Sequence, residues 1–166
     1  MNLPDPNRII DILAEEIRPQ LKPDSAFLGI HTGGVWVMEA LLERLGVDLP
    51  HGVLDIAFYR DDFSRIGLHP EVKPSNIPFE VEGRHILLID DVLYTGRTVR
   101  AAMNLIFDYG RPSRIRLAVL IDRGGRELPI RADYMGAKMD LEPGQNISLE
   151  RDAGGTLRLA LKQVAA

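Results

Sequence analysis

Two consecutive aspartates, Asp90 and Asp91, follow an apolar run at residues 86–89 and precede a short segment rich in hydroxyl groups. At the carboxyl end of a buried strand, paired carboxylates lose hydration and need a cationic or hydroxyl-bearing partner. Open α/β sheets bind their ligands at that end of the strands. The two acids therefore indicate a binding site for a polyol, a metal ion, or both.

The next residues, 94–98, have the sequence Tyr-Thr-Gly-Arg-Thr and lead into an amphipathic stretch that continues to residue 106. Backbone N–H groups at a helix start, two hydroxyls and a guanidinium form a good phosphate cradle. The segment matches neither the Walker A nor the Rossmann glycine pattern. A ligand with ribose hydroxyls at one end and a phosphate at the other would fit both the paired acids and the phosphate cradle. The alternative is a plain helix cap, although a cap needs one acid and no arginine.

A second loop of similar character follows an apolar run at residues 26–30. It has the sequence His-Thr-Gly-Gly at residues 31–34 and precedes a helical pattern with apolar residues from Val35 to Leu45. Two glycines let backbone amides approach an anion closely. His31 can hydrogen-bond a phosphate, or it can be an ordinary surface or core histidine.

The elements that position these loops alternate between strand and helix patterns. A helix is predicted from Asp5 and Pro6 to Ile17, and strands at 26–30, 53–58, 86–89 and 114–121. Continuous apolar runs are typical of parallel strands that are covered on both faces. We expect an α/β fold with a mainly parallel, twisted central sheet flanked by helices. Segments 146–150 and 156–161 predict an antiparallel hairpin in the tail.

A long polar stretch runs from Tyr59 to Pro78 after the strand expected at 53–58. Connections of this length are uncommon in a compact domain and are usually lids or binding loops. A lid would exclude water from a reactive ligand. The alternative is a disordered excursion.

Composition limits the class of protein. The 166 residues include no cysteine, which excludes disulfides and thiolate metal sites, and the length predicts one domain spanning residues 1–166. The first residues lack a signal-peptide pattern, and no apolar run approaches a membrane span, so we expect a cytoplasmic protein that binds no membrane.

The formal net charge of −4 argues against general nucleic-acid binding, and DNA is not expected as a partner. The charge is uneven, however: residues 84–131 contain nine arginines, no lysine and five acids, which makes that segment +4 and the remainder −8. Arginine suits forked phosphate contacts. A phosphorylated small molecule, an RNA backbone or a solvated arginine face would each account for the excess.

The run from 86 to 98, with Gly-Arg-Pro-Ser at 110–113 and Asp-Arg-Gly-Gly-Arg-Glu-Leu-Pro-Ile-Arg-Ala-Asp-Tyr at 122–134, closely resembles the PyrR family. These are uracil phosphoribosyltransferases of the type I fold, some of which also regulate pyrimidine operons by binding messenger RNA. The resemblance covers about residues 27–138. It implies that uracil and phosphoribosyl pyrophosphate (PRPP) react to give UMP and pyrophosphate, with Mg²⁺ bound mainly through PRPP. It also implies a homodimer or a higher homo-oligomer.

The resemblance also implies residue roles. Asp90 and Asp91 would orient the ribose hydroxyls. The metal would have no dedicated protein ligand and would be bound mainly through PRPP, with Asp90 or Asp91 as the candidate for a direct contact. The pyrophosphate loop, which in type I enzymes often holds a non-proline cis peptide, would be formed by His31, Thr32, Gly33 and Gly34. The PRPP or nucleotide would be held by Asp90, Asp91, Val92, Leu93, Tyr94, Thr95, Gly96, Arg97 and Thr98. Arg60 in the lid and Arg123 would steady the pyrophosphate charge, and Tyr134 and Met135 would bind the base; Tyr134 as plain core packing is the alternative.

Two positions separate the competing functions. Many PyrR proteins have an arginine where this chain has Gly33, so pyrophosphate binding or an RNA role of that loop is weakened. Purine transferases commonly have an aspartate at the position of Tyr94, which favours a pyrimidine here. The alternatives are an RNA-binding regulator whose pocket senses UMP, and a purine or hypoxanthine transferase. The sequence therefore leaves open whether messenger RNA is a partner.

Overall fold

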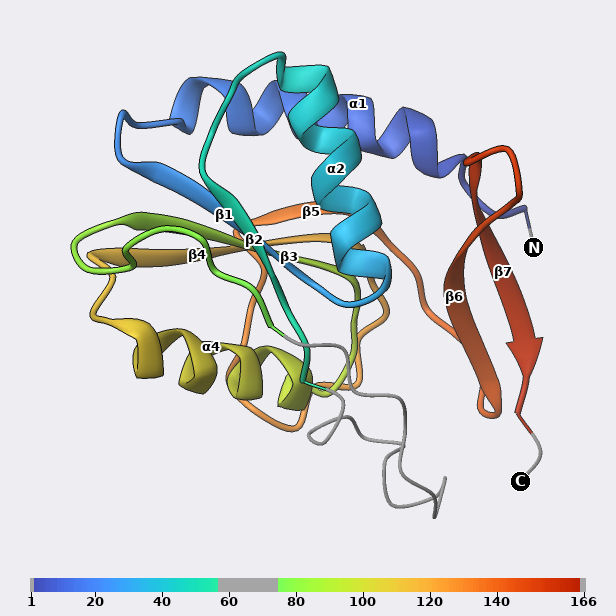
Figure 1. Ribbon diagram of the computed structural model, residues 1–166. Helices are drawn as coiled ribbons and strands as arrows, with labels where there is room; N and C mark the ends of the chain where they lie inside the picture. Colours follow the sequence, from blue (N-terminus) through green and yellow to red (C-terminus); the bar gives the residue numbers. More distant parts are fainter. Residues whose placement is uncertain (1, 57–74, 165–166) are drawn as a thin grey trace.

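The computed structural model describes residues 2–56 and 75–164 of the chain. Helices and strands are interspersed up to β4, as the sequence pattern predicts, and β2 and β3 follow each other among the described elements (Figure 1). They are α1 (Pro6–Ile17), η1 (Arg18–Gln20), β1 (Ser25–Ile30), α2 (Gly33–Leu45), β2 (His51–Leu54), β3 (His85–Leu93), α4 (Arg97–Tyr109), β4 (Arg114–Asp122), β5 (Tyr134–Lys138), β6 (Gln145–Arg151) and β7 (Leu157–Gln163).

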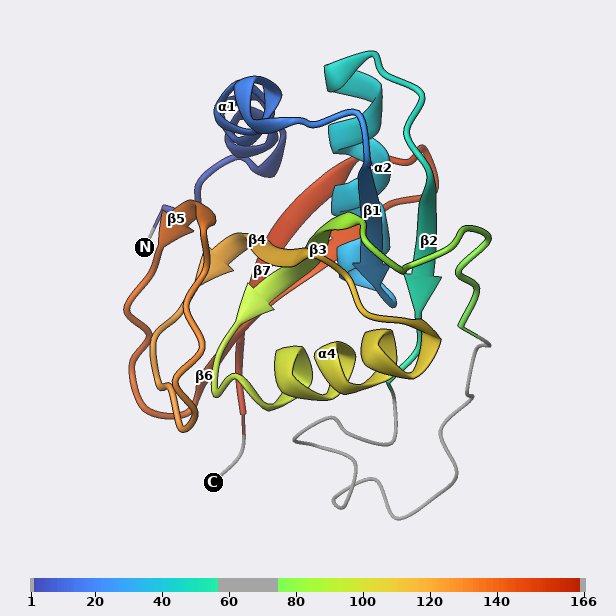
Figure 2. The same cartoon turned by 90° about the vertical axis from the view of Figure 1, so that its left-hand side faces the viewer.

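Five strands form a central sheet in the order β2-β1-β3-β4-β5, and each neighbouring pair is parallel. Helices α1 and α2 cover one face of the sheet, and α4 covers the other (Figures 1 and 2). This arrangement explains why the central strands are apolar on both sides, since neither face meets water. The predicted α/β fold with a parallel sheet is confirmed.

Successive residues of β3 supply the two hydrophobic cores. Leu87 and Ile89 pack with α1 and α2, whereas Ile86 and Leu88 pack with α4. The alternation follows from the two-residue period of a strand. It continues into the site, because Asp90 is the next residue on the α4 side of the sheet.

Local signals at the helix ends agree with the sequence. The Asp5 side chain accepts a hydrogen bond of 2.9 Å from the backbone N–H of Asn7, and Pro6 starts α1. Helix α2 ends at Gly46, whose φ of 64° is the left-handed conformation that favours glycine. Among the described residues, no helix has the length and hydropathy of a membrane span.

Strand β2 differs from the expected strand at 53–58. It begins at His51 because His51 and Gly52 pair with Phe27 and Leu28 of β1, and it ends at Leu54. Histidine followed by glycine is a weak strand signal, which explains why the sequence pattern missed the start. Residues 57 and 58 and the first part of the expected lid, 59–74, lie outside the described residues. The end of that segment, 75–78, is described, and Asn76 exchanges two backbone hydrogen bonds of 2.8 Å with Val53.

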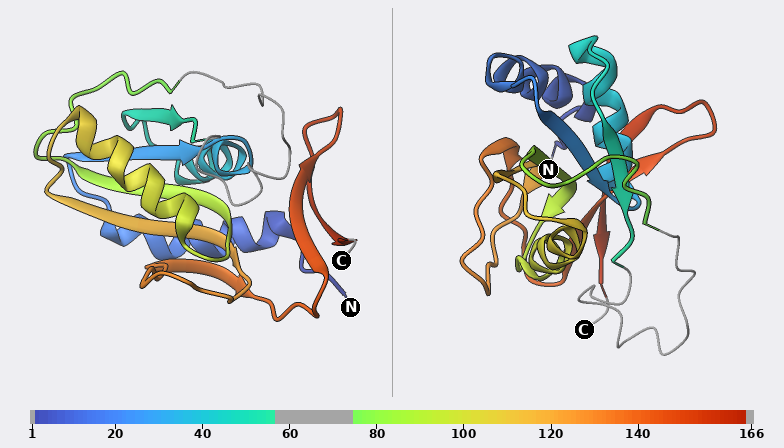
Figure 3. Two further views of the ribbon diagram at one scale, coloured as in Figure 1. Left: turned by 90° about the horizontal axis from the view of Figure 1, so that it is seen from below. Right: turned by 60° about the vertical axis from the view of Figure 1, so that its left-hand side comes forward.

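The predicted tail hairpin is confirmed as the antiparallel pair β6-β7, a two-stranded sheet of its own. It stands across the carboxyl edge of the central sheet (Figure 3, left). Its residues Ile147, Leu149, Leu157 and Leu159 are buried in the core on the α1 and α2 side. The hairpin therefore forms one wall beside the loops that follow β1 and β3.

Candidate active site

Two loops lie next to each other at the carboxyl edge of the sheet. One connects β1 to α2 through His31 and Thr32, and the other connects β3 to α4 through residues 94–96. Strands β1 and β3 are adjacent and parallel, with Gly29 opposite Ile89, so both loops leave the sheet at the same edge. The peptide bond between His31 and Thr32 is cis, as the family resemblance implied for this loop.

The paired acids occupy the end of β3 at this edge. Asp90 is only 4% exposed, and its Oδ1 accepts a hydrogen bond of 2.9 Å from the N–H of Asp91. Asp91 Oδ1 accepts a hydrogen bond of 2.8 Å from the N–H of Val92. These bonds hold both carboxylates in a defined orientation, and a carboxylate offers about four acceptor sites in all.

Asp91 lies against the loop that connects β1 to α2. A Cβ atom at Gly33 would lie 2.5 Å from Cγ of Asp91 and closer still to Oδ2. A Cβ atom at Gly34 would lie 2.5 Å from the carbonyl oxygen of Ile89. The two glycines therefore permit the start of α2 to lie directly against the end of β3, which places the Asp91 carboxylate beside the N–H groups of α2.

The cradle at residues 95–98 has the geometry of a helix start. Thr95 is 4% exposed, and its Oγ1 accepts a hydrogen bond of 3.2 Å from the N–H of Arg97. Gly96 has a φ of 95°, which favours glycine, and α4 begins at the next residue. The side chain of Arg97, in contrast, is directed to Glu127, with Nη2 to Oε1 at 2.8 Å. The backbone of the cradle, more than this guanidinium, is therefore poised for an anion.

Arg123 connects the second loop to the hairpin. Its guanidinium carbon lies 3.9 Å from the centre of the Tyr94 ring. It also donates to Asn146 Oδ1 at 2.9 Å and to the carbonyl of Gln145 at 3.2 Å. The sequence indicated Arg123 as a charge-steadying residue, but it gave no signal for the contact with Asn146, which depends on the tertiary position of the hairpin.

Arg126 is a site residue that sequence reasoning did not assign. It donates to the carbonyl of Tyr94 at 2.6 Å and to Asp122 Oδ2 at 2.6 Å. Burial opposes ionisation of the Asp122 carboxyl, but the hydrogen bonds from Arg126 and from the N–H of Gly124, with the charges of Arg126 and Lys138, hold its pKa below the usual value. Arg126 thus braces the loop that carries Tyr94.

The base-binding role that the resemblance implies for Tyr134 stays a prediction. This residue pairs with Ala118 at the start of β5, and its hydroxyl accepts a hydrogen bond of 3.1 Å from Arg116 Nη1. Tyr134 lies level with Ile89, because both residues pair with Ala118. Its ring lines a hollow on the α1 side of the sheet, whereas the Asp90 side chain lies on the α4 side.

The other predicted residues divide into three groups. Val92, Leu93 and Thr98 lie with the aspartates and the cradle, within β3 and the first turn of α4. Met135 pairs with Val119, is 40% exposed, and is separated from Asp90 by β4. Arg60 lies outside the described residues. Residues 2–56 and 75–164 contain no group of three or more His, Asp or Glu side chains that could hold a metal ion.

Comparison with known proteins identifies relatives over most of the chain. The family described as Phosphoribosyl transferase domain matches residues 3–153. A protein named Bifunctional protein PyrR from Nitrosococcus oceani is 54% identical over 160 residues, covering 90% of both chains. A protein of the same name from Pseudomonas fluorescens is 49% identical over 169 residues, covering 99% of both chains.

Solved structures agree in fold. A hypoxanthine phosphoribosyltransferase from Staphylococcus aureus has a TM-score of 0.68 at 20% identity, covering 86% of this chain and 76% of its own. A hypoxanthine-guanine phosphoribosyltransferase from Bacillus anthracis has a TM-score of 0.66 at 16% identity, covering 89% of this chain and 87% of its own. At such identities the likeness shows the fold alone.

Proposed function

Because this chain belongs to the phosphoribosyl transferase domain family and, within it, to the PyrR proteins, we propose that it transfers the phosphoribosyl group of PRPP to uracil, giving UMP and pyrophosphate. One observation carries the proposal: the Asp91 carboxylate lies against Gly33, so the predicted ribose site and the predicted pyrophosphate loop are in contact. PRPP joins ribose hydroxyls to pyrophosphate at adjacent carbons and needs two such sites side by side.

Each part of PRPP has a place at this edge of the sheet. Asp90 and Asp91 accept hydrogen bonds from the ribose hydroxyls, and the N–H groups of residues 95–98 hold the 5′-phosphate. The loop from His31 to Gly34 receives the pyrophosphate. Arg123 contributes positive charge from the β4 side, and Arg60 has the same role in the expected lid.

The reaction breaks the bond between ribose C1 and a pyrophosphate oxygen and forms a bond from C1 to N1 of uracil, which loses its proton. Positive charge develops on the ribose ring as pyrophosphate leaves. The two fixed carboxylates beside the ring stabilise that charge, and the N–H groups of the first loop stabilise the leaving anion. Positioning of the two substrates supplies the remaining rate enhancement.

Magnesium fits this arrangement as a partner of PRPP. Mg²⁺ usually binds one or two carboxylates together with substrate phosphates and water, and two neighbouring carboxylates are what β3 offers. When bound, the ion neutralises charge on the leaving pyrophosphate. Asp90 and Asp91 are the residues that would hold it.

Uracil must lie within reach of ribose C1, at the carboxyl edge of the sheet. We place the base beyond the carboxyl ends of β4 and β5. Arg123 follows β4 there, and Lys138, which pairs with Asp122, ends β5. Donor groups such as these can pair with the carbonyl oxygens of a pyrimidine, and a mismatched base would leave them unpaired.

The test is formation of labelled UMP from labelled uracil, PRPP and Mg²⁺. The wild-type protein should form UMP only when PRPP and Mg²⁺ are both present. The double variant Asp90→Asn with Asp91→Asn should lose this activity, and Asp108→Asn, an exposed acid on α4, is the matched control. No UMP from a folded wild-type protein would overturn the proposal.

A regulatory role is the second candidate, because the relatives are named bifunctional. The surface of α1 and α2 does not favour RNA. Arg44 Nε lies 2.6 Å from Asp11, and Arg18 lies 3.3 Å from Glu15, so these cations are already paired with acids. We therefore propose that catalysis is the main activity and that RNA binding by this face is weak.

A further inference from the structure

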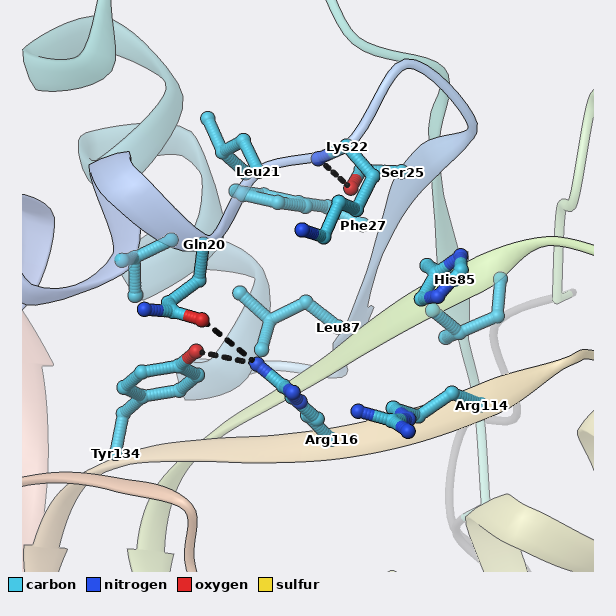
Figure 4. Close-up of a pocket in the computed structure, with 12 residues that line it drawn as sticks. Gln20, Leu21, Lys22, Ser25, Phe27, His85, Leu87, Arg114, Arg116 and Tyr134 are labelled. Atoms are coloured by element: carbon cyan, nitrogen blue, oxygen red, sulfur yellow. Dashed lines mark hydrogen bonds between the residues drawn. The ribbon is translucent and has the colours of Figure 1, made fainter.

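The hollow that the Tyr134 ring lines is on the α1 side of the sheet, beside the amino ends of β3 and β4 (Figure 4). Its cavity volume is about 50 Å³, and the space that includes its open mouth is about 450 Å³. The Asp90 side chain lies on the α4 side of the sheet, and Leu87, which lines the hollow, is three residues away along β3, which corresponds to roughly 10 Å. The hollow is therefore distinct from the proposed active site.

One side of the hollow is apolar. Its walls are the end of α1, the residue after η1, and the α1-facing side chains of β1 and β3, namely Ile17, Leu21, Phe27 and Leu87. Phe27 is fully buried, and Leu87 is 7% exposed. An occupant would therefore meet packed hydrocarbon on this side.

The opposite side is cationic. Arg114 and Arg116 lie two residues apart on β4, so both side chains project from the same face, and Lys22 lies at the mouth (Figure 4). Arg116 Nη1 donates to Tyr134 at 3.1 Å and to Gln20 at 3.4 Å, which are neutral oxygen atoms. The guanidinium is thus held in position without an opposing charge.

The nearby acids do not neutralise these groups. Both Asp24 oxygens lie 3.0 Å from Nδ1 of His85, and Asp133 Oδ2 accepts a hydrogen bond from the N–H of Leu117. Within the part of the chain that the structure describes, the side chains of Arg114 and Lys22 make no hydrogen bond or ion pair. The hollow therefore combines an apolar wall with two guanidinium groups that form no ion pair among the described residues, although Asp133 lies beside them.

We propose that this hollow binds a small amphipathic anion, with a flat or branched apolar body and one carboxylate or phosphate group. The apolar body would cover Leu21 and Leu87, and the anionic group would bridge Arg114 and Arg116 through charge-assisted hydrogen bonds. An inorganic anion would leave the apolar wall uncovered, and a neutral apolar molecule would leave the guanidinium groups unpaired.

Isothermal titration calorimetry with four probes tests this site. Benzoate and phenyl phosphate carry both features, whereas benzyl alcohol lacks the charge and inorganic phosphate lacks the apolar body. We expect saturable binding of benzoate, phenyl phosphate or both, at one site per chain, and at least about tenfold weaker binding of the two control probes. Benzoate alone identifies the carboxylate class, and phenyl phosphate alone identifies the phosphate class.

Variants locate the site. Arg114→Gln should weaken binding of the amphipathic probe at least about tenfold, and Arg111→Gln, an exposed arginine outside the hollow, should not change it. Arg114 is preferred to Arg116 because its loss breaks no hydrogen bond in the described structure. Saturating PRPP should leave the probe affinity unchanged.

Four results would overturn the proposal. They are no binding of either amphipathic probe, equal binding of benzyl alcohol, equal losses in Arg111→Gln and Arg114→Gln, and displacement of the probe by PRPP, which would place it in the active site. Sedimentation velocity adds a fifth: a change of oligomeric state in Arg114→Gln would show that this face binds a second copy of the chain instead.

Discussion

Replacement of Gly33 by alanine should separate catalysis from stability. The new Cβ would lie 2.5 Å from Cγ of Asp91, whereas ordinary contacts begin at 3.4 Å, so the carboxyl carbon must withdraw by about 0.9 Å. A displacement near 1 Å in a positioning group can cost about 100-fold in rate. We therefore expect kcat/KM for uracil and PRPP to fall by about two orders of magnitude in Gly33→Ala.

The fold should tolerate the same change. The obstacle is a side chain that can rotate, and the loss of its hydrogen bond to Val92 costs about 0.5 to 1.5 kcal/mol. Alanine is favoured over glycine within a helix by about 1 kcal/mol, and Gly33 is the first residue of α2. The free energy of unfolding in urea should therefore stay within about 1 kcal/mol of wild type.

Gly34→Ala is the matched comparison. Its Cβ would meet backbone, with the Ile89 carbonyl oxygen at 2.5 Å and Asp90 Cα at 3.1 Å, and a central strand cannot move aside. We expect this variant to lose about 1 to 3 kcal/mol of stability. The account is refuted if folded Gly33→Ala retains wild-type kcat/KM, or if it is destabilised as strongly as Gly34→Ala.

Three further predictions follow from the site and the surface. UMP at a hundredfold excess over its Kd should stabilise the wild-type protein by about 2.7 kcal/mol and raise its Tm by about 5 to 10 °C, whereas the Asp90→Asn, Asp91→Asn protein should show no rise in a thermal-shift assay. Asp122→Asn should lower the free energy of unfolding by about 1.5 to 3 kcal/mol at neutral pH, because the pKa of the native carboxyl is lowered. This contribution is present above the pKa of the unfolded chain, about 3.9, and is lost as the pH falls through the pKa of the native carboxyl. Urea unfolding at neutral pH and at about pH 2.5 should therefore show a smaller difference between variant and wild type in acid. Filter binding to the leader RNA of the organism's pyrimidine genes should show weak affinity that falls steeply with salt, with a slope of about −0.7 per phosphate contact, and submicromolar, UMP-enhanced binding at physiological salt would contradict this expectation.

Features within one short segment could be predicted from the sequence. The cap at Asp5, the apolar strand that leads to Asp90, and the helix start after Gly96 each depend on neighbouring residues, and the structure contains all three, although β3 continues past Asp90 to Leu93. The tail hairpin was predictable for the same reason, because its alternating pattern and its turn are contiguous. The parallel sheet followed from the continuous apolar runs.

Features that depend on tertiary geometry could not be predicted. The contact of Asp91 with Gly33 joins residues from two loops, and the bond from Arg123 to Asn146 requires the hairpin to lie across the sheet edge. Tyr134 shows the same dependence. Only the register of β5 against β4 shows that Tyr134 lies level with Ile89, next to the level of Asp90.

The choice between uracil and a purine is the central claim, and a competition assay tests it directly. Labelled uracil and labelled hypoxanthine are supplied together with limiting PRPP and Mg²⁺, and the two nucleotide products are quantified. Buried polar groups that match one base can reject another by about 10⁴-fold. We predict that UMP exceeds the hypoxanthine nucleotide by at least about a thousandfold at equal base concentrations. Equal or greater formation of the purine nucleotide would contradict the account.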